Sequence, residues 1–369
     1  QERVALEVLY NATGGEHWAD SPANGWLVDP CHCQWVDVRC DDPMACDDSP
    51  VAGVYRQSDQ TDKNLRGVLP SWNGDPGQGA LPQLQGLALT DNPGLSGTLP
   101  EEWGNMAQMT LLYLYKNNLD GSLPEAWGGM AQMADLQLFN NHLDGSLPEA
   151  WGNMKQVTTM RLDVNHLIGS LPGAWGGMTK METLYLSTNH LNGSLSEAWG
   201  NMTQMGDLQL NNNSLDGTLP ASWGPRMFNM QSLRLQNNHI TGTLPPSWSQ
   251  WNRYFNLLDI SSNRLVGTLP PQWANTSSPR FSFLSLRNNS LSGTLPSAWS
   301  RLRHLSQLYL DTNRLSGSIP GTLIHHIIPF MHPLYTFITI FTPLNTLYTP
   351  YIRLKNNLLN RYHRRHSRS

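Results

Sequence analysis

Apolar residues return along most of the chain with one regular period. Each period has the form L-x-x-L-x-L-x-x-N-x-L-x-G-x-L-P-x-x-W, and the copy from Asn141 to Met154 reads NHLDGSLPEAWGNM. A weaker first copy ends at Pro70. The glycine of the motif returns every 24 to 26 residues, at Gly97, Gly121, Gly145, Gly169, Gly193, Gly217, Gly242, Gly267, Gly293 and Gly317. A period of this length predicts stacked coils that bury their apolar faces against one another.

Each part of the period predicts its own local structure. The L-x-L segment alternates apolar and polar residues, which predicts a short strand whose leucines point into a core. Asparagine follows where the strand ends, and its amide is suited to bond the backbone of its own and the adjacent coil. We therefore expect a structural ladder from ten asparagines, which are Asn92, Asn117, Asn141, Asn165, Asn189, Asn213, Asn238, Asn263, Asn289 and Asn313.

Tryptophan and methionine recur behind the proline of each period. Tryptophan runs from Trp103 to Trp299, and a methionine column begins at Met106. Evenly spaced residues of these types would also suit a copper or haem site. A packed core is favoured, because tryptophan is a large apolar wedge and methionine fills irregular gaps.

This pattern resembles leucine-rich repeats of the plant and protist type, which carry G-x-[I/L]-P. The P-x-x-W-x-x-M ending is similar to that of the promastigote-surface-antigen family of kinetoplastid parasites. The resemblance covers about residues 51–320. It implies an α/β solenoid, a right-handed arc of about ten repeats with a parallel β-sheet on its concave side. The family resemblance also implies a cell-surface location, often with a lipid anchor, and contact with host molecules.

The first fifty residues differ from the repeats. The segment ERVALEVLYNATGG predicts a short helix with Val4, Ala5, Val8 and Leu9 on one face. Four cysteines follow within sixteen residues, at Cys31, Cys33, Cys40 and Cys46. They predict two disulfides, with three pairings open. A zinc site is the weaker alternative, because C-x-C spacing lacks a second C-x-x-C.

We interpret residues 1–50 as a cap, which covers the apolar edge of the first coil. The stretch resembles the N-terminal cap of plant-type repeats. Disulfides indicate an oxidising compartment. Six N-x-[S/T] sequons agree with that compartment and are glycosylation candidates, at Asn11, Asn192, Asn201, Asn212, Asn275 and Asn288.

Residues 321–369 are unlike the rest of the chain. They contain no acidic residue and six basic ones, and an apolar run there is broken by histidine and proline. The run is a poor membrane helix, and the basic end does not suit a glycolipid-anchor signal. Three interpretations stay open: a frameshifted or misjoined end, an atypical membrane-associated segment, or degenerate repeats suggested by IRLKNNLL at Ile352 to Leu359. Membrane attachment is therefore allowed but carries no clear anchor.

Charge and motifs argue against two classes of function. The chain has a formal net charge of −4, and residues 1–320 hold 18 basic against 28 acidic residues, which disfavours a nucleic-acid partner. None of G-x-S-x-G, H-E-x-x-H, G-x-x-x-x-G-K-[S/T] or a strand-to-helix G-x-G-x-x-G occurs. We expect no catalytic residue, no cofactor and no metal.

Histidine recurs at one further register of the repeat. His142, His166 and His190 follow the ladder asparagine on consecutive coils, and His239 has the same register further on. Two neighbouring imidazoles would suit a shared metal, and a stacked row would suit a pH sensor. An exposed variable position is favoured, because asparagine, serine and arginine fill it in other coils.

Function is expected in the residues that differ between repeats. Three columns point outward from the sheet, and their aromatic residues with a neighbouring arginine are typical of protein interfaces. The candidate partner-binding residues on the concave face are Leu111, Tyr113, Tyr115, Gln137, Phe139, Arg161, Asp163, Tyr185, Gln209 and Arg234. An inert surface is the alternative, since aromatic residues favour strands in any case.

The sequence therefore indicates an extracellular or cell-surface binding protein that holds a protein or glycoprotein partner without chemical turnover. Two alternatives stay open. One is the ectodomain of a leucine-rich-repeat receptor kinase, and the other is a secreted inhibitor of a foreign enzyme.

Overall fold

The computed structural model describes most of the repeats and parts of both ends. The described residues are 2–14, 38–40, 51–57, 65–72, 81–251, 254–274, 281–318, 338–340 and 352–353. They belong to two compact units, Gln1–Leu191 and Asn192–Ser369, and each unit is considered by itself. Cys31, Cys33, Cys46 and Asn275 lie outside the described residues, as does the side chain of Cys40. The disulfide-bonded cap and the division at residues 50 and 320 stay predictions.

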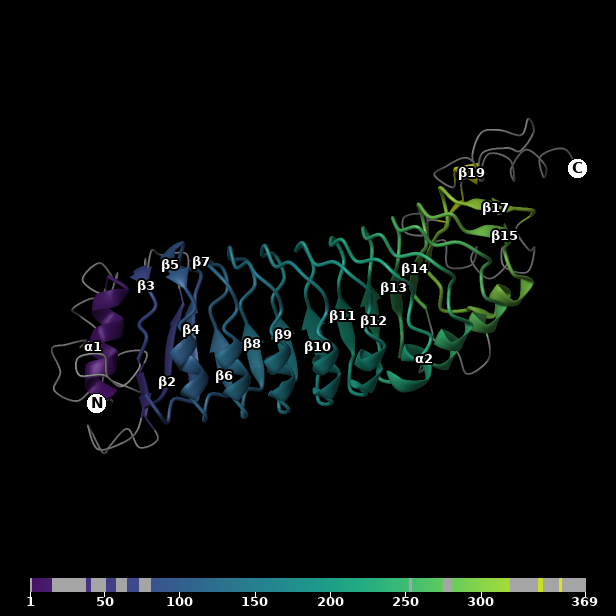
Figure 1. Ribbon diagram of the computed structural model, residues 1–369. Helices are drawn as coiled ribbons and strands as arrows, with labels where there is room; N and C mark the ends of the chain where they lie inside the picture. The colour runs from purple at the N-terminus through teal and green to yellow at the C-terminus, as the bar shows by residue number, and fades with distance from the viewer. Residues whose placement is uncertain are drawn as a thin grey trace, which may run out of the picture. The chain divides into compact units, whose positions relative to one another are not determined.

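In the first unit one strand from each coil joins a sheet (Figure 1). Strand β1 pairs antiparallel with β2, and every later pair is parallel. The strands in spatial order are β1 (Val38–Cys40), β2 (Val51–Gln57), β4 (Gly86–Thr90), β6 (Leu111–Tyr113), β8 (Asp135–Gln137), β9 (Thr159–Arg161) and β10 (Thr183–Tyr185). The predicted parallel sheet, with one short strand per repeat, is confirmed.

The second unit repeats this arrangement. Its parallel strands are β11 (Asp207–Gln209), β12 (Ser232–Arg234), β13 (Leu257–Asp259), β14 (Phe283–Ser285) and β16 (Gln307–Tyr309). Strand β18 (Ile338–Ile340) lies parallel to β16, whereas β19 (Ile352–Arg353) pairs antiparallel with β18. The antiparallel pairing of Ile352–Arg353 is not the parallel pairing of a further repeat. This segment therefore departs from the degenerate-repeat interpretation.

Short helices and edge strands close the coils. In the first unit the 3-10 helices are η4 (Glu101–Asn105), η5 (Glu125–Gly129), η6 (Glu149–Asn153) and η7 (Gly173–Gly177). In the second they are η8 (Glu197–Asn201), η9 (Pro246–Gln250), η10 (Pro271–Ala274) and η11 (Ser297–Arg301), with a short α2 (Trp223–Arg226). Edge strands β3 (Arg66–Val68), β5 (Gly94–Thr98) and β7 (Asn118–Asp120) form one small sheet, and β15 (Ser292–Thr294) and β17 (Arg314–Ser316) form another.

Stacked tryptophans fill the core behind these helices. The rings of Trp103, Trp127 and Trp151 are fully buried and lie 6.1 Å apart in nearly parallel planes. The indole N–H of Trp151 donates to the carbonyl of Pro124 on the preceding coil at 2.9 Å. The packed-core interpretation is confirmed, and the sequence had not indicated that the indole also bonds to proline.

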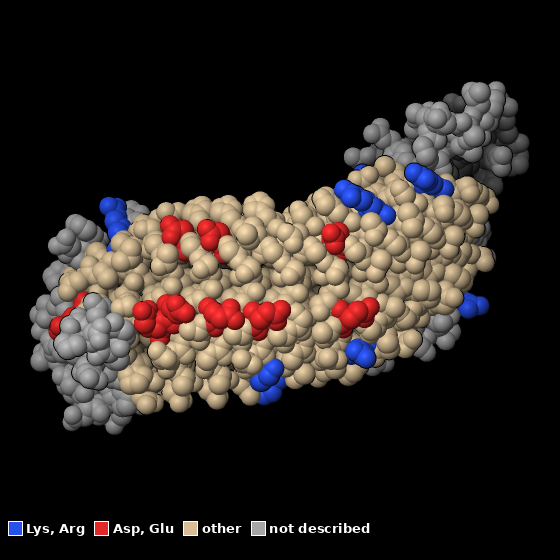
Figure 2. Space-filling model, viewed as in Figure 1, with Lys and Arg blue, Asp and Glu red and all other residues tan. Residues whose placement is uncertain are grey.

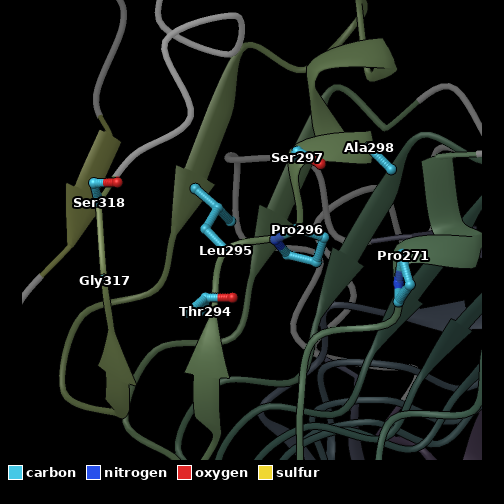
Figure 3. A pocket seen from close by; sticks show the side chains of 8 residues that line it. All are labelled: Pro271, Thr294, Leu295, Pro296, Ser297, Ala298, Gly317 and Ser318. Atoms are coloured by element: carbon cyan, nitrogen blue, oxygen red, sulfur yellow. The ribbon is translucent and has the colours of Figure 1, made fainter.

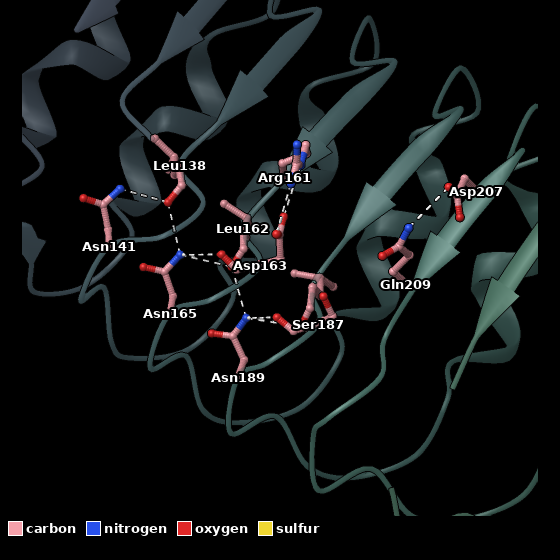
Figure 4. Close-up of polar contacts among 11 residues, drawn as sticks. Leu138, Asn141, Arg161, Leu162, Asp163, Asn165, Ser187, Asn189, Asp207 and Gln209 are labelled. Carbon is pink, nitrogen blue, oxygen red and sulfur yellow. Dashed lines mark hydrogen bonds and ion pairs between the residues drawn. The ribbon is translucent and has the colours of Figure 1, made fainter. Parts of the chain in front are cut away.

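The asparagine ladder is confirmed as a structural element (Figure 4). Asn165 donates through Nδ2 to the carbonyls of Leu138 and Leu162, both at 3.1 Å. Its Oδ1 accepts from the backbone N–H of Leu143 at 3.1 Å. One buried side chain therefore satisfies backbone groups of its own coil and of the coil before it, which would otherwise be buried without partners.

The residue before each ladder asparagine has a left-handed backbone, which sequence reasoning missed. Its φ is +56° at Asn140, +58° at Val164 and +56° at Thr188. Asparagine tolerates this region, whereas a β-branched side chain is strained in it. The coil geometry imposes the conformation whatever residue stands there.

Helix α1 (Glu2–Ala12) confirms the predicted N-terminal helix but not its buried face. Ala5, Leu6, Leu9 and Tyr10 are buried, whereas Val8 is only half-buried. The face is turned toward Leu6 and Tyr10, because the Trp72 indole N–H donates to the carbonyl of Ala5 at 2.9 Å and holds that side of the helix inward.

We predict that Val164→Asn stabilises the protein. Val164 is 42% exposed, so the change removes little packing, and asparagine relieves strain of about 1 kcal/mol in the left-handed backbone. Urea unfolding measures the gain in the free energy of unfolding. Val266→Asn is the control, because Val266 is 45% exposed and is not among the residues with positive φ. Equal effects of the two changes would contradict the strain argument.

We predict that Asn165→Ala destabilises the protein by at least about 2 kcal/mol, because it leaves several buried backbone groups without partners. Urea unfolding followed by circular dichroism measures the loss. His166→Ala, one residue along on the exposed side, serves as the control and should change stability little.

Candidate functional site

Half-buried side chains cover the outer face of the sheet, the face predicted to be concave. In β6 and the residues that follow, Leu112 and Leu114 are fully buried, whereas Leu111, Tyr113 and Tyr115 are partly exposed. The same alternation holds in β8, β9 and β10. Two of the three outward columns, those through Leu111 and Tyr113, are therefore confirmed in these strands, because successive side chains of a strand point to opposite faces. The third is confirmed at Tyr115 and Phe139, whereas Asp163 and Ser187 further along it are buried.

Three aromatic rings on neighbouring coils are in contact on this face. Tyr115 and Phe139 are stacked, with ring centroids 4.5 Å apart and planes 11° from parallel. Tyr113 lies next to Tyr115, with centroids 6.2 Å apart. Such offset pairs stabilise each other beyond the area they bury. The predicted grouping of these rings is confirmed.

Arg161 extends the row of rings to the next two coils. Its guanidinium carbon lies 3.9 Å from the ring centroid of Phe139 and 5.1 Å from that of Tyr185. The guanidinium also donates two hydrogen bonds to the carboxylate of Asp163, Nε to Oδ1 at 3.2 Å and a terminal nitrogen to Oδ2 at 3.1 Å. The arginine is thus held between two rings and one carboxylate. We call Tyr113, Tyr115, Phe139, Arg161 and Tyr185 the aromatic cluster.

Asp163 is buried, although its column predicts an outward side chain. It was a candidate contact residue, but it is only 8% exposed. The carboxylate lies beneath the guanidinium, since the two side chains are two residues apart on one strand face. Asp163 therefore orients and neutralises Arg161 and offers little surface of its own.

Asp135 organises the other end of the cluster, a role that the sequence did not single out. The hydroxyl of Tyr113 donates to its Oδ2 at 2.5 Å, and Nε2 of Gln137 donates to its Oδ1 at 3.1 Å. Asp135 stands in the outward column before Gln137, one strand over from Tyr113. This register could have indicated the contact from the sequence alone, because cross-strand neighbours on one face interact.

The two remaining candidates belong to the second unit. Nε2 of Gln209 donates to Oδ2 of Asp207 at 3.4 Å, and a guanidinium nitrogen of Arg234 lies 3.9 Å from Oδ1 of Asp207. These three side chains form a polar group in the second unit.

A second aromatic pair in this unit was outside the predicted site. Phe283 and Tyr309 lie on adjacent strands with ring centroids 5.6 Å apart. Arg287 is paired with the buried Asp311 at 3.0 Å in the following column. An arginine paired with an aspartate beside aromatic rings thus occurs in both units.

One concave feature lies away from the aromatic cluster. A shallow cavity of about 600 Å³ lies in the second unit beside η10, η11 and β17 (Figure 3). Proline, leucine, alanine, glycine, serine and threonine line it, so its described lining carries no charged or imidazole group. Nothing in that lining suits acid–base or metal chemistry.

Charge is arranged in rows. Figure 2 shows acidic side chains repeating from coil to coil on the face turned to the viewer. Glu125 and Glu149 lie on successive coils and contribute to structure, because their carboxylates accept from the backbone N–H of Ala150 and Ala174, one coil further on. They are exposed, as the sequence predicted for these two carboxylates.

Among the described residues, no helix has the length and apolar character that a membrane span requires.

Comparison with known proteins identifies the repeat. The family profile described as Leucine Rich Repeat matches residues 180–202, 229–251 and 280–302. Curated protein sequences give no match. The fold is a leucine-rich-repeat solenoid, as predicted.

Solved structures of plant proteins share this fold. The peptide hormone receptor RGFR1 in complex with RGF2 is 26% identical with a TM-score of 0.69, over 84% of this chain and 52% of that one. The ectodomain of GASSHO1/SCHENGEN3 from Arabidopsis thaliana, in complex with CASPARIAN STRIP INTEGRITY FACTOR 2, is 26% identical with a TM-score of 0.67, over 88% and 43%. This chain therefore spans about half the length of these receptor structures.

A plant ice-binding protein has the same fold at 23% identity and a TM-score of 0.68, over 86% of this chain and 95% of that one. Proteins named for quite different ligands thus share the scaffold. The function of this chain has to be argued from the residues on its surface.

We predict that Arg161 and Phe139 stabilise each other by about 1 kcal/mol, because the guanidinium lies over the ring. A double-mutant cycle with Arg161→Met and Phe139→Leu, measured by urea unfolding, isolates this coupling. Combining Phe139→Leu with Arg226→Met, an exposed arginine of α2, is the control and should give no coupling. Coupling below about 0.3 kcal/mol in the first cycle would contradict the contact.

Proposed function

We propose that this chain is an extracellular binding protein that recognises a protein or peptide partner through the outer face of its sheet, without chemical turnover. The aromatic cluster carries the proposal. Its rings and guanidinium lie on adjacent coils and are partly exposed. Tyrosine and arginine are the residue types that most often anchor interfaces.

The cluster is preorganised for binding. Arg161 is held by Phe139, Tyr185 and Asp163, and the hydroxyl of Tyr113 is held by Asp135. Side chains that are already ordered lose less conformational entropy when a partner arrives. Because the charge of Arg161 is balanced by Asp163, the cluster favours a partner that offers aromatic or aliphatic surface over one that is merely anionic.

The plant receptors support a peptide or protein as the partner. RGFR1 and the GASSHO1/SCHENGEN3 ectodomain were each solved in complex with the partner that their descriptions name. A receptor ectodomain is accordingly the second candidate function. The observation in its favour is the shared fold at 26% identity over 84% and 88% of this chain.

The extracellular location rests on several features. The five sequons within the described residues all have an exposed asparagine, at Asn11, Asn192, Asn201, Asn212 and Asn288. The four clustered cysteines agree with an oxidising compartment. The P-x-x-W-x-x-M ending of the repeats is similar to that of the promastigote-surface-antigen family, so we include a cell-surface location in the proposal.

We predict that replacing Tyr113, Tyr115 and Phe139 by alanine leaves the protein folded and weakens partner binding by more than about 2 kcal/mol, or roughly 30-fold in Kd. The probe is a peptide selected on the unmodified protein from a phage-displayed random library. Calorimetry then compares its affinity for the two proteins.

The matched control removes exposed apolar surface from outside the main sheet, at Val68, Ile168 and Val266, which are each 45% to 51% exposed. The control should bind the selected peptide as the unmodified protein does. Equal affinity of the triple aromatic variant would contradict the assignment of the cluster. Loss of binding in the control alone would place the site on the other side of the coils.

A further inference from the structure

Three exposed histidines form a row outside the aromatic cluster. His142, His166 and His190 lie on consecutive coils of the first unit, each directly after a buried ladder asparagine. The backbone N–H of each donates to a leucine carbonyl of the preceding coil at 2.8 Å. The backbone therefore holds the three side chains at a regular spacing, and their imidazoles are open to solvent.

The first two imidazoles are unusually close. Nδ1 of His142 lies 3.3 Å from Nε2 of His166, and the ring centroids are 5.5 Å apart with planes 18° from parallel. The next interval is wider, with the rings of His166 and His190 6.0 Å apart. His142 and His166 are thus the pair in which two ring nitrogens meet.

We propose that His142 and His166 form a binding site for a divalent zinc ion. Zinc binds histidine nitrogen at about 2.0–2.1 Å with tetrahedral geometry, so two imidazole ligands of one ion lie roughly 3.3–3.4 Å apart. The observed 3.3 Å matches this separation. Imidazole is among the ligands that suit zinc.

Both rings are free to turn toward one ion. The torsion between the β-carbon and the imidazole is broad, and both side chains are exposed, so a small rotation brings the two lone pairs to a common point. A ring nitrogen binds metal through its lone pair, so the neutral imidazole is the form that binds.

The site has two protein ligands. Among the described residues there is no group of three histidine, cysteine, aspartate or glutamate side chains that would hold a metal ion. Water then fills the remaining positions, as it does in zinc sites with open coordination. The sequence alone favoured an exposed variable position for this column, and the distance between the two nitrogens is the observation that changes the interpretation.

The test uses the full chain, freed of metal with a chelator and titrated with zinc chloride. Diethyl pyrocarbonate modifies neutral imidazole, and peptide mass spectrometry reads the rate at each histidine. With zinc at ten times its dissociation constant, modification of His142 and His166 should slow roughly ten-fold, because only about one-tenth of the sites remain free. His239, which has Ser214 and Arg264 at this register on its neighbouring coils, should be modified at the same rate with and without zinc.

Substitution provides the second measurement. His142→Ser and His166→Ser should each remove one bound zinc in calorimetry, whereas His239→Ser should remove none. Serine suits this position, because Ser214 and Ser290 occupy it in other coils. Zinc that binds elsewhere on the chain remains in all variants and cancels in the comparison. Unchanged modification of both histidines, or equal stoichiometry in all three variants, would overturn the proposal. Neither outcome bears on the aromatic cluster, which shares no residue with this pair.

Discussion

The sheet strands of ten coils end at a ladder asparagine, and the rest of the solenoid depends on the hydrogen bonds of that side chain. Eight of these asparagines are buried, and Asn263 and Asn289 are half-buried. A coil turns sharply inside the protein and leaves backbone N–H and C=O groups that water does not reach. Asn165 bonds four of them, from two coils. An unpaired buried polar group costs about 1–3 kcal/mol, so ten such turns without the ladder would exceed the whole stability of an ordinary domain.

The ladder also fixes the spacing of everything else. Because it ties each coil to the one before, the indoles behind it stack at 6.1 Å and the outward side chains of adjacent strands are held side by side. The same spacing brings two histidine nitrogens to 3.3 Å on consecutive coils. In a repeated scaffold of this kind, residues at the same register of successive coils become neighbours on the surface.

The aromatic cluster is one such row of neighbouring side chains on the surface. Its four rings and one guanidinium come from four different coils, so no local segment contains the cluster. Aspartates complete it from the same strand in one case and from the next strand in the other. The Arg161 guanidinium and the Tyr113 hydroxyl each have a carboxylate partner, which leaves partly apolar, ordered surface available for contact.

The sequence by itself determined the repeat, its strand, the asparagine ladder and the buried tryptophans, because each follows from a residue type at a fixed register. It also determined which columns point outward, since strand side chains alternate. Only the tertiary structure decided that Asp163 lies beneath Arg161, that Asp135 holds Tyr113, and that the position before each asparagine is left-handed even at Val164. The reason is that these depend on rotamers and on the closure of the coil against its neighbour, which register alone does not specify.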